Sequence, residues 1–385
     1  MLDRAIDIQE QIVAWRRELH TFPELSFQET RTAGRIAEEM GRLSCRVRTG
    51  VGRTGVVAEL GEGQPVIAIR ADMDAIAIRE ENDVPYASRC PGVMHACGHD
   101  AHVAIAMGVA ALLAGTDHRG TVRFLFQPAE EKADEEGITG AQRMVQDGAL
   151  EGVKAAISLH VDASSPVGKV KVSEGAVTAG TDVFAASIFG RGGHPGMPEK
   201  AIDPLYIAGH VILALHGLVS QRVEAGAAAT LVVTSIRAGE VANVIPQRVE
   251  MLGSVRYKEP AVRAILHAQV ESALRISQVL GGSYELEIRP RLGPTVNDAR
   301  IAAEVRAAAA GLLGPDCFKR PEYGMAGEDF SVMAALVPAT WFALGCGIEG
   351  DERFHHHPRF DVDERCLPIG AAILAESALR LLRGA

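Results

Sequence analysis

The segment of residues 94–102 reads Met-His-Ala-Cys-Gly-His-Asp-Ala-His, so one thiol, one carboxylate and three imidazoles lie within nine residues. Thiolate, imidazole and carboxylate groups together suit a borderline divalent metal ion such as Zn, Mn, Co or Ni. A single His here is more often an ordinary surface residue than a ligand, so the prediction depends on the whole cluster. Because a chain of this length needs no metal ion to fold, the cluster predicts a catalytic metal site.

Other groups able to do chemistry follow short apolar runs. The runs are residues 65–70, 121–126 and 155–159, each typical of a strand buried on both faces of a largely parallel sheet. The groups that follow them are, in order, Asp72 and Asp74, Glu130 and Glu131, and His160. Ligands in open α/β sheets gather beyond the carboxyl ends of the strands. We therefore expect these side chains to converge with the loop that carries Cys97.

The pattern of the chain changes after Ala179, where alternation of polar and apolar residues replaces the continuous apolar runs. The expected elements are a strand at 181–189, a helix at 202–223, strands at 230–237 and 248–257, a helix at 261–280 and a strand at 284–288. This βαββαβ order has the ferredoxin-like plan. We predict an α/β fold of two domains, with a catalytic α/β sheet domain at residues 1–179 and 293–385 and an inserted α+β ferredoxin-like domain at 180–292.

The sequence disfavours two other functions, dinucleotide binding and serine-hydrolase activity. Gly50, Gly52 and Gly55 match the dinucleotide-binding pattern G-x-G-x-x-G, but a short strand and a turn follow them, not the helix that such a site requires. A serine hydrolase is disfavoured as well, because no G-x-S-x-G elbow occurs.

Composition limits the partners and the compartment. The net charge is -10 with acids and bases interspersed, so nucleic acid is not an expected partner. The six cysteines lie far apart and include no C-x-x-C pair, which suggests reduced thiols and the cytoplasm. Residues 1–10 carry four charges and form no apolar signal core, and no later run of about 18 apolar residues is apparent. We therefore expect neither export nor a membrane.

Motifs along nearly the whole chain resemble the M20 metallopeptidase family, in particular its amidohydrolase branch of hippurate hydrolases, N-acetyldiaminopimelate deacetylases and auxin-conjugate hydrolases. The motifs are Arg16-Arg17-Glu18-Leu19-His20 with Pro23-Glu24-Leu25, Arg70-Ala71-Asp72-Met73-Asp74, residues 94–102, Gln127-Pro128-Ala129-Glu130-Glu131, Gly192-Gly193-His194 with Met197-Pro198, Asn243-Val244-Ile245-Pro246, Gly327-Glu328-Asp329-Phe330 and His356-His357-Pro358-Arg359-Phe360-Asp361. The family fold is a catalytic α/β domain interrupted by a lid domain, which agrees with the change of pattern near Ala179.

The resemblance implies a site with two divalent ions per subunit. The implied ligands, of which the thiolate is shared between the ions, are Cys97, His99, Glu131, His160 and His356. Glu130 matches the family's general base. Asp74 matches a carboxylate that contacts a metal ligand and does not itself bind the metal. On the lid domain, His194 matches the residue that stabilises the oxyanion, and Asn243 and Arg256 would hold the carboxylate of the substrate. Relatives also imply a homodimer or higher homo-oligomer through the lid domain.

The implied reaction is hydrolysis of the amide bond of small N-acyl amino acids. A carboxypeptidase or dipeptidase is the alternative at the same site, because a peptide presents the same scissile bond and carboxylate. A catalytically silent metal-binding protein is a further alternative, although storage would need ligands and no base. Five further residues are expected to support the ligands or the fold and not to bind metal themselves: His95, Asp100, His102, His355 and His357. Pro195-Gly196 and Ile76-Ala77 depart from the family pattern and bear on the shape of the pocket.

Overall fold

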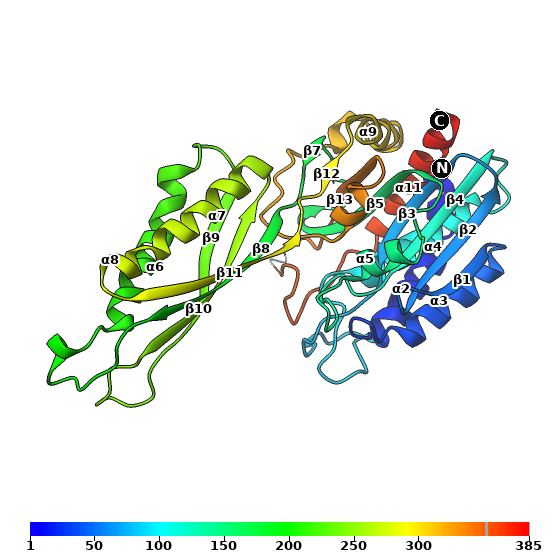
Figure 1. Cartoon of the computed structure of the whole chain (residues 1–385). Coiled ribbons are helices and arrows are strands. Elements are labelled where there is room, and N and C mark those ends of the chain that lie inside the picture. Colours follow the sequence, from blue (N-terminus) through cyan, green and yellow to red (C-terminus); the bar gives the residue numbers. More distant parts are fainter. Residues whose placement is uncertain (351–352, 385) are drawn as a thin grey trace. The chain divides into compact units, whose positions relative to one another are not determined.

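The structure of the chain is a computed structural model that describes residues 1–350 and 353–384. The chain divides into two compact units (Figure 1). Unit 2 comprises Ala176–Pro294 and Tyr323–Glu328, and unit 1 comprises the other described residues. The first two boundaries lie a few residues from those expected at 179 and 293. The return of Tyr323–Glu328 to unit 2 was not expected, because the sequence analysis assigned all of residues 293–385 to the catalytic domain.

A mixed sheet forms the centre of unit 1. In its described residues, the order of the seven strands is β1 (Arg46–Val51), β2 (Gly55–Glu62), β4 (Gly120–Gln127), β3 (Val66–Asp72), β5 (Val153–Pro166), β13 (Ala339–Gly347) and β6 (Val170–Lys171). The neighbouring strands β4, β3, β5 and β13 are parallel, and antiparallel strands pair at both sides of them. Every residue of β3 is buried, as expected for a strand covered on both faces.

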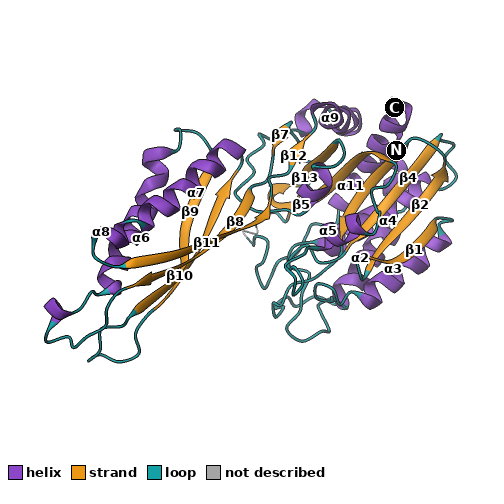
Figure 2. Cartoon of the chain, viewed as in Figure 1, coloured by secondary structure: helices purple, strands orange, loops and turns teal. Residues whose placement is uncertain are grey.

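Helices cover this sheet on both faces (Figure 2). The helices of unit 1 are α1 (Leu2–Asp7), α2 (Gln9–Thr21), α3 (Thr30–Arg42), α4 (His99–Leu113), α5 (Gly140–Gln146), α9 (Ala299–Leu313), α10 (Phe330–Ala334) and α11 (Cys366–Arg383), with a short 3₁₀ turn at Pro315–Cys317. The most buried of them is α4, which packs against α2 and α11. The first residue of α4 is His99, so the central helix of the core begins inside the predicted metal motif. The short strands β7 (Gly175–Ala176) and β12 (Val296–Asn297) lie near the unit boundary.

Unit 2 has the βαββαβ order expected from the sequence. Its elements are β8 (Gly180–Phe189), a 3₁₀ turn at Pro198–Lys200, α6 (Pro204–Arg222), β9 (Ala229–Arg237), β10 (Arg248–Tyr257), α7 (Pro260–Leu274), α8 (Ile276–Val279) and β11 (Ser283–Leu292). The strands form an antiparallel sheet in the order β11-β8-β10-β9. Figure 2 shows α6, α7 and α8 on one face of this sheet. Buried and exposed residues alternate along β10 because only that face is covered.

Helix α6 departs from one sequence expectation. Among the described residues it is the one helix that is long and apolar enough to cross a membrane by length and composition. The sequence analysis required an unbroken apolar run, and the polar residues His210 and His216 interrupt it. In the structure, Ile207, Val211 and Leu215 of α6 are buried in the core of unit 2. The helix therefore covers a sheet in this fold.

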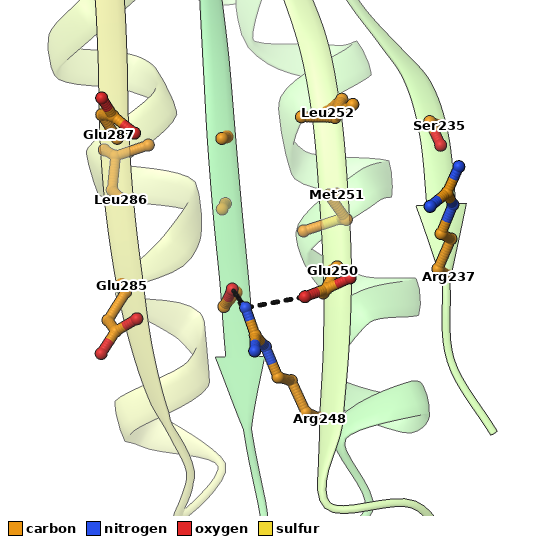
Figure 3. A pocket seen from close by; sticks show the side chains of 12 residues that line it. Ser235, Arg237, Arg248, Glu250, Met251, Leu252, Glu285, Leu286 and Glu287 are labelled. Carbon is orange, nitrogen blue, oxygen red and sulfur yellow. Dashed lines mark hydrogen bonds and ion pairs between the residues drawn. The ribbon is translucent and has the colours of Figure 1, made fainter.

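The opposite face of the sheet of unit 2 is open and slightly hollowed (Figure 3). Its charged side chains include Arg237, Arg248, Glu250 and Glu285. Arg248 pairs with Glu250 at 2.8 Å and donates a hydrogen bond to Ser187 at 2.8 Å. Side chains of both charge signs therefore occur on this face.

Candidate metal centre

The carboxyl ends of the parallel strands bring the predicted residues together in unit 1. Asp72 ends β3 and pairs in register with Gln127 at the end of β4. Glu130 and Glu131 follow Gln127 within four residues, and His160 lies on β5 beside β3. The parallel strands thus deliver these groups to one edge of the sheet, as expected.

Five side chains form what we call the five-residue cluster: Cys97, His99, Glu131, His160 and His356. Their ligand atoms form two overlapping groups of three, and within each group the atoms all lie within 4.8 Å of one another. One group joins Cys97 to His99 and His160, and the other joins Cys97 to Glu131 and His356. Cys97 belongs to both groups, and its Sγ lies 3.5 Å from Nε2 of His160. This arrangement has the form of two adjacent ligand sets that share a thiol.

Two atoms of the cluster are buried without hydrogen bonds. Nε2 of His99 and Oε1 of Glu131 have no hydrogen-bond partner among the described residues. The nearest ring nitrogens to this oxygen are Nε2 of His356 at 3.3 Å and Nε2 of His99 at 3.9 Å. Buried polar atoms without partners are rare in folded proteins, and an ion is one of the few explanations. The sulfur, nitrogen and oxygen donors of this cluster suit a borderline divalent metal.

The pKa of the Cys97 thiol depends on the burial and the charges around it. Burial raises its pKa well above the usual value, and the nearby carboxylate of Glu131 raises it further. The thiol would therefore stay protonated at neutral pH in the protein alone. A divalent cation reverses this balance, because it stabilises a coordinating thiolate.

Asp74 connects one histidine of the cluster to the segment that carries both glutamates. Its carboxylate accepts hydrogen bonds from the backbone N–H groups of Glu130 and Glu131, at 3.2 and 3.1 Å, and from the hydroxyl of Ser26 at 2.7 Å. The Nδ1 atom of His99 lies 2.9 Å from the carbonyl oxygen of Asp74. A carbonyl can only accept, so Nδ1 carries a proton, and in the neutral imidazole Nε2 presents its lone pair to the cluster.

The same argument assigns the protons of His160 and His102. Nδ1 of His160 lies 2.7 Å from the carbonyl of Val161 and must donate, which leaves Nε2 directed at Cys97. Nε2 of His102 accepts the N–H of Val161 at 2.9 Å, and its Nδ1 donates to Asp72. Both ring nitrogens of His102 are therefore occupied, which agrees with the structural role expected for it.

His356 is the exposed member of the cluster. Its backbone N–H donates to the carbonyl of Ala96 at 2.8 Å, which ties the residue to the loop before Cys97. Its φ of 65° is unusual for a residue other than glycine. About half of its side chain is exposed, at 53%. A backbone held in a disfavoured conformation at such a position is common where a side chain must be aimed at a functional site.

The remaining polar residues of the motifs have structural partners or lie outside the two ligand groups. Asp100 pairs with Arg16 and His20, at 2.8 and 2.7 Å. Nδ1 of His357 accepts the N–H of Arg359. His95 is buried and His355 is partly buried, and desolvation lowers their pKa values to about 4 and about 3.

The other three predicted residues lie in unit 2. The loops of His194 and Asn243 are adjacent, because Gly193 and Ile245 form a β-bridge between them. His194 is exposed, and its Nδ1 accepts the N–H of Gly196 at 3.0 Å, so the Nε2 of the neutral imidazole carries the proton. Arg256 donates to the carbonyl of Met325 at 2.6 Å. It thereby holds Tyr323–Glu328 on unit 2, a contact that the sequence analysis did not foresee.

The comparison with known proteins decides the family. The sequence pattern described as peptidase family M20/M25/M40 matches residues 68–380. The chain belongs to this family. An N-acetylcysteine deacetylase of Bacillus subtilis is 37% identical over 388 residues, which cover 99% of both chains. Thermostable carboxypeptidase 1 of Saccharolobus solfataricus is 33% identical over 97% of this chain and 96% of its own length.

A solved structure extends the comparison to the fold of this M20 protein. The YXEP protein of Bacillus subtilis, titled a dinuclear metal binding peptidase from the M20 family, aligns with a TM-score of 0.86 and 34% identity. The alignment covers 98% of this chain and 99% of that one. The predicted resemblance to the M20 family is confirmed, and so is the prediction that the chain is an enzyme of the hydrolase class.

Sequence analysis of this M20 enzyme missed three buried groups around the cluster. Arg70 pairs with Asp72 at 2.7 Å and with Asp329 at 2.9 Å, and its charge holds the pKa of Asp72 well below the usual range although burial alone would raise it. Arg16 lies one turn after Ile12 on the apolar side of α2, a position that signals a buried charge. Glu29 has no such signal, because it precedes a helix and resembles an ordinary exposed acid.

Proposed function

We propose that this enzyme is a metal-dependent amidohydrolase that cleaves the amide bond of small N-acyl amino acids. The observation that carries the proposal is the pair of ligand groups that share Cys97, beside the segment of Glu130 and Glu131. The deacetylase relative, with 37% identity over the whole chain, supports the substrate class. The hydrolase relatives leave the silent metal-binding alternative without support.

In this proposal the five-residue cluster holds two divalent ions, such as Zn, Mn, Co or Ni. When bound, the ions lower the pKa of a water molecule from ~15.7 toward ~7 and polarise the carbonyl of the amide. As a thiolate, Cys97 would be the ligand common to both groups. Asp74 keeps Nδ1 of His99 protonated, so that the lone pair on Nε2 would be available to hold an ion.

Glu130 is the proposed general base. One of its carboxylate oxygens lies in one group with a ring nitrogen of His99 and the carboxylate of Glu131, all within 4.8 Å of one another. The hydrogen bond from its backbone N–H to Asp74 fixes the start of its side chain. From this place Glu130 takes a proton from the attacking water and then delivers it to the nitrogen of the leaving amine.

The residues of unit 2 supply the proposed contacts to the substrate. The Nε2–H of His194 donates to the oxyanion that develops on the carbonyl oxygen. Asn243, on the adjacent loop, and Arg256 bind the carboxylate of the substrate. An arginine has five N–H donors, so the bond from Arg256 to Met325 leaves others for this task. The homodimer or higher homo-oligomer expected through this lid domain, like the absence of nucleic-acid and membrane partners, stays a prediction.

We also propose that the enzyme acts in the cytoplasm. All six cysteines are free thiols in the structure, and four of them are buried. Reduced, buried thiols fit a reducing compartment.

The test is hydrolysis of a panel of N-acetyl, N-benzoyl and indole-acyl amino acids, before and after exhaustive chelation. Activity on at least one of these amides should disappear with the metal and return with added Zn, Mn or Co. Activity that survives when metal is shown to be absent would refute the proposal. Dipeptides and longer peptides belong in the same panel, because the carboxypeptidase relative, at 33% identity, favours that second candidate. Cleavage of peptides alone would select it.

A further inference from the structure

The segment that carries Glu130 and Glu131 begins with an unusual backbone conformation. Ala129 has a φ of 49°, in the left-handed region that residues with a side chain rarely adopt. Such a conformation persists only where the surrounding structure holds it. Residue 129 directly precedes the proposed base and the proposed ligand, so its backbone sets the direction in which both side chains leave the turn.

Two buried carboxylates hold this turn through three successive backbone N–H groups. Asp74 accepts the N–H groups of Glu130 and Glu131, as described above. The third N–H, that of Ala129, donates to Oε1 of Glu29 at 2.9 Å. On the other side of the residue, the N–H of Gly140 donates to the carbonyl of Ala129 at 3.0 Å. Both peptide groups of Ala129 are therefore held in place.

Glu29 is fully buried at the start of α3. A carboxylate at this position could be explained as a cap of the helix, but the structure excludes that role. Glu29 is the N-cap residue of α3, yet its side chain makes no capping hydrogen bond to that helix. Its two oxygens instead accept the N–H of Ala129 and the hydroxyl of Thr54. Burial, followed by the nearness of Asp74, raises the pKa of Glu29 to about 7. The fold thus buries a carboxyl group whose charged form is disfavoured there. Burial of such a group costs free energy, and its hydrogen bonds to Ala129 and Thr54 offset that cost.

We propose that Glu29 is a positioning residue, which holds Ala129 in the left-handed conformation so that Glu130 and Glu131 point into the five-residue cluster. The inference rests on the proposed function for the roles of the two glutamates. It adds one requirement for activity: a hydrogen-bond acceptor must stand where Oε1 of Glu29 lies, so that it can bind the N–H of Ala129.

Two substitutions separate the acceptor from the charge. Glu29→Gln keeps an oxygen at the same reach and can turn its amide group toward Thr54, but it removes the charge. Glu29→Asp keeps the carboxylate and withdraws it by one methylene from Ala129. The proposal predicts that Gln resembles the wild type and that Asp is impaired. Asp182→Ala serves as the control, because Asp182 is an equally buried carboxylate in unit 2.

The first readout is the affinity of the full chain for Zn²⁺, measured by competition with a chromophoric chelator. Glu29→Asp should weaken Zn²⁺ binding by about 10-fold or more, as substitutions behind metal ligands commonly do. In Glu29→Gln and Asp182→Ala, the affinity for Zn²⁺ should stay within about 3-fold of the wild-type value, a smaller change than the one expected for Glu29→Asp. Normal affinity in Glu29→Asp, or equal losses in Glu29→Asp and Glu29→Gln, would overturn the inference.

The second readout does not need a metal. Hydrogen–deuterium exchange of the metal-free protein reports on the amides of residues 129–131 directly. Glu29→Asp should speed exchange there while leaving the peptides of unit 2 unchanged, and Glu29→Gln should not. Unchanged protection in Glu29→Asp would overturn the inference. A wild-type protein that binds no Zn²⁺ would instead overturn the proposed function, so the two failures can be told apart.

Discussion

Replacing Arg16 by Met should destabilise the protein strongly. The guanidinium is fully buried and pairs with Asp100 at 2.8 Å, Asp361 at 2.7 Å and Glu364 at 3.2 Å. Met fills a similar volume but removes the buried cation that the three carboxylates share, so that among the described residues Asp100 keeps only His20 and Glu364 keeps only Arg17 as a charged partner. Breaking a buried ion pair by removing one partner costs about 3–5 kcal/mol. We expect a loss of that size in the free energy of unfolding.

The neighbouring residue provides a matched control. Arg17 contacts the same Glu364, at 2.6 Å, but 47% of its side chain is exposed. Exposed ion pairs contribute no more than about 1 kcal/mol. Urea unfolding of the wild type, Arg16→Met and Arg17→Met, followed by circular dichroism at one metal concentration, measures the difference. Losses that agree within about 1 kcal/mol for the two variants would refute the claim that burial makes the Arg16 contacts strong.

Three further predictions concern charge and catalysis. Burial alone would lower the pKa of His20, but the contact with Asp100 raises it to about 9, above the 6.5 of the unfolded chain. Protonated His20 therefore contributes up to about 3 kcal/mol to the free energy of unfolding below pH 6.5, and this contribution is lost as the pH rises to 9. In His20→Gln, the free energy of unfolding should change less with pH between 6.5 and 9. Glu130→Gln should keep its metal and lose ~100-fold to ~10,000-fold in turnover, so comparable turnover would reject it as the base. His194→Ala should lower turnover by ~100-fold with metal content and folding intact, and an effect on the Michaelis constant alone would contradict its role at the oxyanion.

The sequence predicted the features that depend on local pattern. Continuous apolar runs ended at the residues that meet in the structure, since parallel strands share one edge at their carboxyl ends. The βαββαβ order of unit 2 followed from residues that alternate along its strands. Motif order along the chain was enough to indicate the family, which the comparison with known proteins then confirmed.

Features that depend on contacts between distant segments were not predictable. Glu29 and Ala129 are a hundred residues apart, and neither residue type signals the hydrogen bond between them. The assignment of Tyr323–Glu328 to unit 2 depends on Arg256 and Lys258, which donate to backbone carbonyls of that segment. Carbonyl acceptors occur at every residue, so such contacts leave no trace in sequence.

The central claim is that Cys97 joins two ligand groups into one site for two ions. The most direct test is the metal content per subunit of the purified full-length protein, measured by mass spectrometry for the wild type and for Cys97→Ala after incubation with Zn, Mn or Co. The account predicts two ions in the wild type and a clear loss in the variant, because both groups lose the same ligand. A wild type without bound metal, or a Cys97→Ala variant with the full content, would contradict it.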